Sequence, residues 1–345
     1  MAEPRRPIDV CITIDAEYDI NDSLEKPETH SPLGFSSMLR SDGERSQGLG
    51  FILDTLGGHG LPATFFVEVF CAHFFGTGEV RRMVDAIRAA GPHDLQLHAH
   101  PCWRYFRDPE WRRSVKTLIK NDSWAGRGDS ALPMLREAIE LFAAITGGPP
   151  RVFRSGNLQV DTAVHAALAQ LGIPASSSVG LGLSMPESPA LRRWLQPTRI
   201  DGVLEVPVAA YREPGLRGDR VKCLTITGTA WPVTRRLLDW AHRMQRGPLV
   251  ILTHASEFAT PAGACASENG RYRTDPLNQA RLRALAAFLA RERNRFNTTT
   301  FAAGLATWQA APPADAGQAD DAVFVAPRLA RLTRAVETAW TRLRP

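Results

Sequence analysis

Short apolar runs with strand character alternate along the chain with longer segments in which apolar residues recur every three or four positions. Residues 9–15, 62–69 and 248–258 show the first pattern, and residues 79–91 and 131–147 show the second, each closed by glycine. This alternation predicts a parallel sheet or barrel covered by helices. Further strands are predicted at 94–100, 151–157, 173–179, 203–208, 222–227 and 296–301, and further helices at 46–60, 161–172, 233–247, 278–293 and 302–309.

Two polar stretches interrupt this alternation and are longer than ordinary connections between elements. Residues 19–45 contain proline and serine, and residues 103–130 form an insert rich in tryptophan. Long loops in a compact domain are often functional, so we expect both stretches to flank the mouth of a site.

The pattern predicts one domain and a C-terminal appendage. Residues 1–308 hold the alternating elements, residues 309–323 form a linker rich in Ala, Pro, Asp and Gly, and residues 324–345 form an amphipathic helix. We expect this helix to dock on the parent domain, with a partner or a membrane surface as the alternative. Its apolar side chains at helical spacing are Leu329, Leu332, Val336, Trp340 and Leu343.

Composition and charge fit a large α/β domain and exclude several classes of function. The chain has 345 residues, of which 44% are hydrophobic, so a sizeable core is available. The net charge of +5 comes largely from arginines spread along helices, and no nucleic-acid-binding module is present, so no nucleic-acid partner is predicted. No apolar run reaches the length of a transmembrane segment.

The cysteines indicate a reducing compartment. They are scattered and form no CxxC pair, which predicts neither a disulfide framework nor a thiolate zinc site. No secretory signal precedes the first strand, so we expect a cytoplasmic protein. The five residues are Cys11, Cys71, Cys102, Cys223 and Cys265.

The candidate chemistry lies at the carboxyl ends of four predicted strands. In parallel sheets and barrels, reactive residues gather at these ends. Parallel strands would therefore place four groups of polar side chains on one rim. The groups are Asp15 with Glu17, His98 with His100, Arg154 with Asn157, and His254.

Two of these groups are pairs spaced two residues apart, which places both side chains on one face of a strand. Asp15 and Glu17 would repel each other unless a cation lies between them or one is protonated; alternatively, Glu17 has left the strand and is solvated. The Cα atoms of His98 and His100 should lie about 6.5 Å apart, from where two imidazoles can converge on one metal. The alternative is one buried and one surface histidine.

Two imidazoles and one carboxylate form a three-ligand set that leaves a position open for water. The second carboxylate would then be the base for that water. Arg154 would hold the base in its ionised form, and His254 would protonate a leaving group. Taken alone, Arg154 is equally well explained as part of a structural salt bridge. A lone histidine is more often a hydrogen-bonded structural residue than a catalytic one.

The order of the motifs resembles that of the polysaccharide deacetylase family, the NodB-homology group of carbohydrate esterase family 4. The resemblance covers roughly residues 8–308. It is closest to the subgroup with an Asp-x-Glu first motif and a His-x-His-Pro second motif, which includes deacetylases of lipopolysaccharide biosynthesis. The segments that carry it are "CITIDAEYD", "GLPATFFVEV", "LQLHAHP", "VFRSGN", "GIPASSSV", "VILTHASEF" and "RFNTTTFAAG".

This resemblance implies an α/β fold, a distorted (β/α) barrel of about seven strands, together with the C-terminal helix. It also implies a role for each residue at the rim. Asp15 matches the catalytic base, Arg154 the arginine that orients the base, and His254 the general acid. The metal ligands of the family match Glu17, His98 and His100.

The chain also departs from the pattern of better-known members, which have two adjacent aspartates in the first motif and three residues between the histidines. The fourth motif usually carries an aspartate that supports the acid histidine, but "PASSSV" has none. What fixes the tautomer of His254 is therefore open, and Asp161 is nearby in sequence.

The implied activity is metal-dependent removal of an N-acetyl group from a sugar or glycan precursor, in the biosynthesis of cell-surface polysaccharide or lipopolysaccharide. The metal would be Zn²⁺, and the same ligands accept Co²⁺, Ni²⁺ or Mn²⁺. We expect Asp15 and His254 on opposite sides of one pocket, with a backbone N–H near "HPCW" helping to hold the oxyanion. The alternatives are a C–N hydrolase of a small non-sugar amide, a non-catalytic carbohydrate-binding relative, and a metal-free glycosidase that uses Asp15 and Glu17.

Aromatic side chains of the insert have two interpretations. They stack on sugar rings at the mouth of the site, or they pack on each other and hold the insert together, which we prefer slightly. These side chains are Trp103, Tyr105, Trp111 and Trp124.

Overall fold

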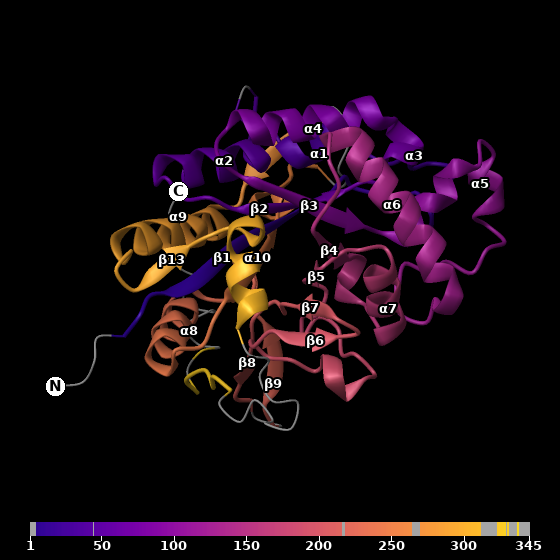
Figure 1. Ribbon diagram of the computed structural model, residues 1–345. Helices are drawn as coiled ribbons and strands as arrows, with labels where there is room; N and C mark the ends of the chain where they lie inside the picture. Colours follow the sequence, from indigo (N-terminus) through magenta and orange to yellow (C-terminus); the bar gives the residue numbers. More distant parts are fainter. Residues whose placement is uncertain are drawn as a thin grey trace.

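The protein, seen in a computed structural model, is described at residues 5–43, 45–215, 218–263, 270–311, 323–328, 330 and 337. Within these residues, one main sheet of nine strands has the order β10-β1-β2-β3-β4-β5-β7-β6, and β13 pairs with β1 (Figure 1). Every pairing is parallel except that of β6 with β7. The strands are β1 (Ile8–Ala16), β2 (Thr64–Glu68), β3 (Asp94–Ala99), β4 (Val152–Ser155), β5 (Ala175–Ser176), β6 (Thr198–Ile200), β7 (Val203–Glu205), β10 (Leu249–His254) and β13 (Phe296–Thr298).

The sheet curls into a distorted barrel because the chain after β7 returns to β10. The amide of Ala209 donates to the carbonyl of Val250 at 3.0 Å, and the amide of Leu252 donates to the carbonyl of Leu224 at 3.1 Å. Two hairpins lie outside the main sheet. One joins β8 (Ala210–Glu213) to β9 (Arg220–Cys223), and the other joins β11 (Ala259–Pro261) to β12 (Tyr272–Thr274).

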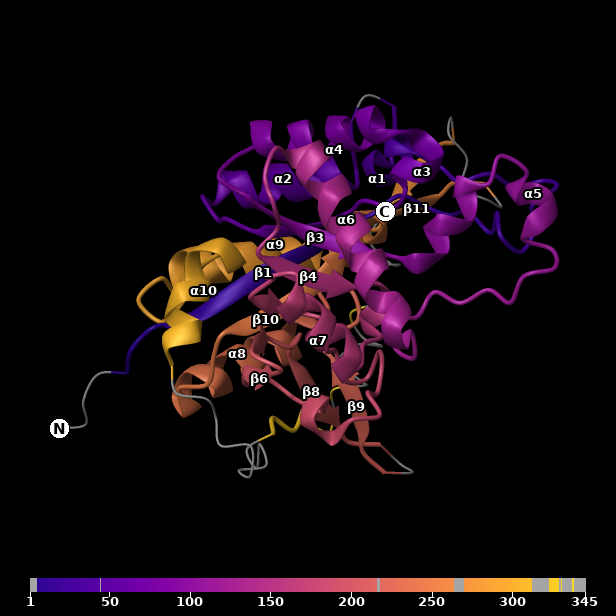
Figure 2. The same cartoon turned by 45° about the vertical axis from the view of Figure 1, so that its right-hand side comes forward.

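Helices surround the barrel, and neighbours pack in the order α8, α9, α2, α1, α4, α6, α7 (Figures 1 and 2). N-cap side chains stabilise two of them. Asp161 accepts from the amide of Val164 in α7, and Asp275 accepts from the amide of Asn278 in α9. The helices are α1 (Phe35–Leu39), α2 (Leu49–Gly58), α3 (Ala72–Phe75), α4 (Thr77–Ala89), α5 (Trp111–Ser114), α6 (Ala131–Thr146), α7 (Thr162–Gln170), α8 (Trp231–Met244), α9 (Pro276–Arg291) and α10 (Phe301–Ala310), with short 3₁₀ turns at Pro101–Arg107, Gly128–Ser130, Gly156–Leu158, Pro189–Leu191 and Ala255–Phe258.

Helix α10 covers the amino ends of the strands. The amides of Phe301 and Ala302 donate to side chains of Thr64 and Asp94, the first residues of β2 and β3. The apolar side chains of α10 belong to the same buried cluster as those of the barrel interior. The cluster includes Cys11, Phe66, Val152, Val250, Leu252, Phe301, Leu305 and Trp308. The amino end is thereby filled, which leaves the carboxyl ends of the strands for the site.

The prediction of a distorted α/β barrel is confirmed, with two differences in detail. The main sheet has more strands than the seven expected. The three-residue strand β6, where no strand was predicted, pairs with β7, and β13, which lies within the predicted strand 296–301, pairs with β1. The predicted strand 222–227 is irregular: it ends the hairpin strand β9 and then bridges from Thr225 to Leu252 of β10.

Most of the predicted C-terminal helix and linker lies outside the described residues, including Leu329, Leu332, Val336, Trp340 and Leu343. The described residues of this segment contact the domain at two places. The amide of Ala326 donates to the carbonyl of Arg212 at 2.8 Å, and the carboxylate of Glu337 lies 2.9 Å from the guanidinium of Arg281.

Aromatic side chains of the insert pack on the domain rather than project from it. Trp103, Trp111 and Trp124 are buried, and the hydroxyl of Tyr105 donates to the carbonyl of Ile119 within the insert. Trp124 is the anchor: its indole N–H donates to the carbonyl of Ala99 at 2.6 Å, and its ring lies against Phe70 and Phe153.

We expect Trp124→Ala to lower the free energy of unfolding by about 3–5 kcal/mol, because a large buried side chain leaves a cavity. Trp124→Phe, which keeps most of the ring contact and loses the hydrogen bond to Ala99, should lose less. Denaturant unfolding of the three proteins measures this. Equal stability of wild type and Trp124→Ala would show that the insert is not anchored here.

Candidate metal centre and active site

Four strand ends deliver the candidate residues to one rim, as parallel pairing requires. Asp15 of β1 is in register with His254 of β10, and His98 of β3 is in register with Arg154 of β4. All four strands run in the same direction. Their carboxyl ends therefore meet at the end of the barrel opposite α10.

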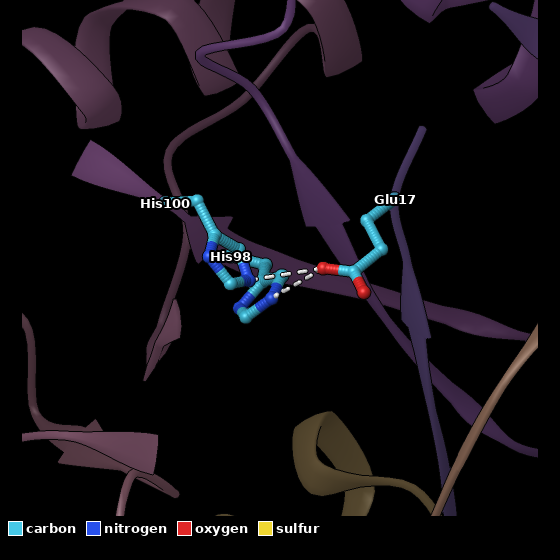
Figure 3. Close-up of side chains that lie close together, drawn as sticks. All are labelled: Glu17, His98 and His100. Atoms are coloured by element: carbon cyan, nitrogen blue, oxygen red, sulfur yellow. Dashed lines mark ion pairs between the residues drawn. The ribbon is translucent and has the colours of Figure 1, made fainter. Parts of the chain in front are cut away.

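The side chains of Glu17, His98 and His100 converge (Figure 3). Glu17 Oε2 lies 3.3 Å from His98 Nε2 and 3.0 Å from His100 Nε2. Their ligand-type atoms all lie within 4.8 Å of one another. Glu17 has left β1 and is partly exposed, but it turns toward the histidines rather than into solvent.

The tautomer of His98 suits a metal. Nδ1 of His98 donates to the main-chain oxygen of Arg154 at 2.9 Å, which leaves Nε2 as the atom with a free lone pair. Nε2 of His98 is buried and has no hydrogen-bond partner in the described part of the chain. A buried nitrogen without a partner is costly unless something binds it, and a metal between Glu17, His98 and His100 would do so. The residues present therefore fit a divalent metal.

Electrostatics also hold these groups in charged forms. Burial alone would raise the pKa of Glu17, but the imidazoles of His100 and His98 outweigh it and hold that pKa well below its usual range. Burial likewise disfavours a charged His100, yet Glu17 and Asp122 raise its pKa well above the ordinary value. The cluster thus favours positive charge, and a metal cation would take the place of the proton.

Asp15 lies beside the cluster and is held by Arg154, both buried. A guanidinium nitrogen of Arg154 donates to Asp15 Oδ1 at 2.7 Å and to the hydroxyl of Thr13 at 3.0 Å. The rest of the guanidinium donates to Ser177 and lies over the ring of Phe66. Arg154 therefore fixes one oxygen of Asp15, while the other, Oδ2, faces His98 Nε2 at 4.0 Å and His254 Nε2 at 3.8 Å.

Asp15 and His254 occupy adjacent rather than opposite walls of the site, because β1 and β10 pair with these residues in register. His254 Nε2 is also 3.8 Å from Glu17 Oε1. Both catalytic candidates thus lie beside the candidate metal ligands.

Glu257 supports His254, a role that sequence reasoning left open. Its carboxylate lies 3.3 Å from Nδ1 of His254 and accepts from the main-chain amide of His254 and the hydroxyl of Thr253. Burial disfavours the imidazolium, but Glu257, Glu17 and Asp15 outweigh it and raise the pKa of His254 to about 9. Asp161 has another task, since it accepts from the amides of Val164 and Gly126.

We expect Glu257→Gln to move the alkaline limb of the kcat/KM pH profile to lower pH. A general acid works only while protonated, so activity falls as pH rises through the pKa of His254, and loss of the neighbouring carboxylate lowers that pKa. At neutral pH, kcat/KM should fall by less than about 100-fold, because removal of a general acid itself costs at least that much and Glu257→Gln leaves His254 in place. Glu25→Gln, at an exposed carboxylate, is the control, and an unmoved alkaline limb in Glu257→Gln would contradict the assignment.

Two further carboxylates border the site. Asp122 Oδ2 lies 2.6 Å from Nδ1 of His100. Glu68, at the end of β2, is fully buried, accepts from the amides of His100 and Phe70, and has its pKa raised by burial to about 7. Glu68 could have been predicted as a site residue from its position at the end of a strand, whereas no sequence pattern in the insert indicates Asp122.

The site opens into a cavity of about 310 Å³. Both long polar stretches contribute to its walls, as their length suggested. Segment 19–45 supplies Asp19, Ile20 and Ser37, and the insert supplies Trp103 and Asp122. Other lining residues are Glu17, Tyr18, His100, Cys102, Asn157 and Ser256.

The backbone N–H groups near "HPCW" are already engaged. The amide of Cys102 donates to Asp122 at 2.9 Å, and that of Trp103 donates to the carbonyl of His100 at 3.2 Å. The expectation that this turn supplies an oxyanion donor is therefore wrong for these two groups.

Among the described residues, no helix has the length and apolar character needed to cross a membrane.

No protein-family model and no curated protein sequence matches the chain. Solved structures do. PuuE allantoinase aligns at 13% identity and a TM-score of 0.49, over 91% of this chain and 96% of its own. A protein assigned as a polysaccharide deacetylase from Mycobacterium smegmatis aligns at 16% and 0.43, over 91% and 95%. A family 4 carbohydrate esterase from Streptomyces lividans, in complex with acetate, aligns at 13% and 0.40, over 85% and 92%. These similarities concern the fold.

Proposed function

We propose that the protein is a metal-dependent hydrolase that removes the acetyl group from an acetamido sugar or glycan precursor. The observation that carries this proposal is the convergence of Glu17, His98 and His100 beside Asp15 and His254. It combines a three-ligand set with a base and an acid, which is the set that hydrolysis of an amide needs. The motif order of the sequence agrees with it, as do the named activities of two of the three reported structural neighbours, the polysaccharide deacetylase and the carbohydrate esterase.

The metal, which we propose is Zn²⁺, would polarise the acetyl carbonyl and lower the pKa of water when bound by Glu17, His98 and His100. Asp15 Oδ2 accepts the proton of the attacking water, because Arg154 occupies the other oxygen of this carboxylate. His254 then gives its proton to the departing nitrogen, since an amide anion is a very poor leaving group. Glu257 holds His254 with Nε2 directed to the site.

A role in cell-surface polysaccharide or lipopolysaccharide biosynthesis, in the cytoplasm, completes the proposal and rests on the sequence resemblance. The cavity of about 310 Å³ suits one sugar residue better than a long stretch of polymer. Its described lining contains carboxylates and no lysine or arginine, which favours a neutral acetamido sugar.

The test is release of acetate from a panel of acetamido sugars, nucleotide sugars, glycan oligomers and small non-sugar amides. We expect turnover with a sugar substrate that stops when a chelator removes the metal and returns when Zn²⁺ is added. Turnover of small amides alone would instead support a C–N hydrolase of non-sugar substrates. Full metal occupancy without turnover on any substrate would support a non-catalytic relative. Release of reducing sugar without acetate, unaffected by the chelator, would support a metal-free glycosidase.

A further inference from the structure

His100 differs from His98 in how its ring is held. His98 lies within β3, and a main-chain carbonyl of the neighbouring strand β4 fixes its Nδ1. His100 lies one residue beyond the end of β3, and its ring nitrogens face the carboxylates of Glu17 and Asp122. Its main-chain amide is fixed by the buried carboxylate of Glu68, but this bond does not set the rotation of the imidazole.

The ring of His100 is oriented by the insert. Asp122 Oδ2 lies 2.6 Å from Nδ1, a short charge-assisted hydrogen bond that directs Nε2 toward Glu17 at 3.0 Å. On one side the ring lies against the backbone of Gly156, where an added Cβ would come within 2.5 Å of Nδ1. The ring is therefore confined by packing and pinned by one carboxylate.

Asp122 is itself fixed by two further hydrogen bonds from different parts of the rim. Its Oδ2 accepts from the side-chain amide of Asn157 at 2.7 Å, and its Oδ1 accepts from the main-chain amide of Cys102 at 2.9 Å. Asn157 adopts a left-handed backbone conformation with φ 56°, which is uncommon for a residue other than glycine. Two residues along the insert, Trp124 ties the chain to Ala99 at the end of β3.

We propose that Asp122 is a positioning residue of the metal site, so that the insert completes a site whose ligands all come from the barrel. This inference rests on the proposed metal-dependent function. A carboxylate behind a metal-bound histidine fixes its tautomer, orients its ring and raises its basicity as a ligand, and loss of such a partner typically costs about 10- to 100-fold in metal affinity.

The experiment compares Zn²⁺ affinity of wild type, Asp122→Asn and Asp129→Asn by competition with a chromogenic chelator. Asp129 is an exposed carboxylate of the same insert, so it controls for charge and location. We expect Asp122→Asn to raise the Kd for Zn²⁺ by about 10- to 100-fold and Asp129→Asn to leave it unchanged. Thermal denaturation of the metal-free proteins separates this from instability, because a positioning role predicts similar melting of both variants.

A double-mutant cycle with Asn157→Ala tests whether Asn157 acts through Asp122. Asn157→Ala should weaken Zn²⁺ binding in the wild-type background and have no further effect in Asp122→Asn. The absorption spectrum of the Co²⁺-loaded proteins is a second readout, since a rotated His100 changes the coordination geometry.

The outcomes separate the two proposals. Wild-type affinity in Asp122→Asn, with an unchanged Co²⁺ spectrum, overturns the positioning role and leaves the metal-dependent function standing. A lowered melting temperature of metal-free Asp122→Asn together with unchanged Zn²⁺ affinity also overturns it, because the role is then structural. If neither the wild type nor Asp129→Asn binds Zn²⁺, Co²⁺, Ni²⁺ or Mn²⁺, the metal-dependent function fails first, and this inference fails with it.

Discussion

Asp15→Asn is expected to lower kcat by about 100- to 10,000-fold, the range that a general base contributes, while the metal stays bound. An asparagine oxygen can still accept the hydrogen bond that Arg154 donates to Asp15 Oδ1 at 2.7 Å. The side chain can no longer take a proton from water. Steady-state kinetics on the substrate found in the panel, together with metal analysis of the purified variant, measures both effects.

The matched variant is Glu17→Gln. It should lose the metal, and it should lose activity as a consequence of that loss. Asparagine at position 15 leaves the buried Arg154 without its counter-charge, so thermal denaturation must show that the variant is folded at the assay temperature. If Asp15→Asn loses the metal and Glu17→Gln keeps it, the two carboxylates have exchanged roles.

His98→Gln should raise the Kd for the metal by more than about 100-fold. Loss of a residue that only supports a ligand costs up to about that much, and this substitution removes a ligand itself. Nε2 of His98 is buried and lacks a hydrogen-bond partner among the described residues, and the proposed metal would satisfy it. Chelator competition gives the affinity, and acetate release should fall in parallel and recover only at high Zn²⁺ concentration.

His59→Gln is the control for this variant, since His59 follows α2 far from the four strand ends in sequence and belongs to no ion pair of the described chain. Unchanged Zn²⁺ affinity in His98→Gln would mean that the cluster in Figure 3 is an ordinary hydrogen-bonded group.

The barrel and the four strand ends were predictable because both depend on local patterns. Apolar strands alternating with helices specify parallel pairing, and parallel pairing places Asp15, His98, Arg154 and His254 at one end whatever the rest of the chain does. The same reasoning did not place Asp15 relative to His254. Their adjacency depends on β10 pairing with β1, a contact across most of the chain that no local pattern specifies.

The supporting carboxylates show the same limit. Glu257 lies three residues after His254 within "HASEF", so the 3₁₀ turn that joins them was a local feature that the search for a fourth-motif aspartate overlooked. Asp122 could not be found this way. It reaches His100 only because Trp124 ties the insert to β3, and an irregular insert has no period from which its path can be read.

The contacts of Glu257 with His254 and of Asp122 with His100 therefore differ in how easily local motion breaks them. His254, the proposed acid, and the carboxylate of Glu257 belong to one short turn, so they keep their mutual geometry through any motion that moves this turn as a unit. The carboxylate behind His100 sits on a separate segment, and the bond between them survives only while the insert stays closed on the barrel. Gradual heating should therefore release the proposed metal before it disturbs the His254–Glu257 pair, and loosening of residues 103–130 would abolish the proposed activity while the barrel is still folded.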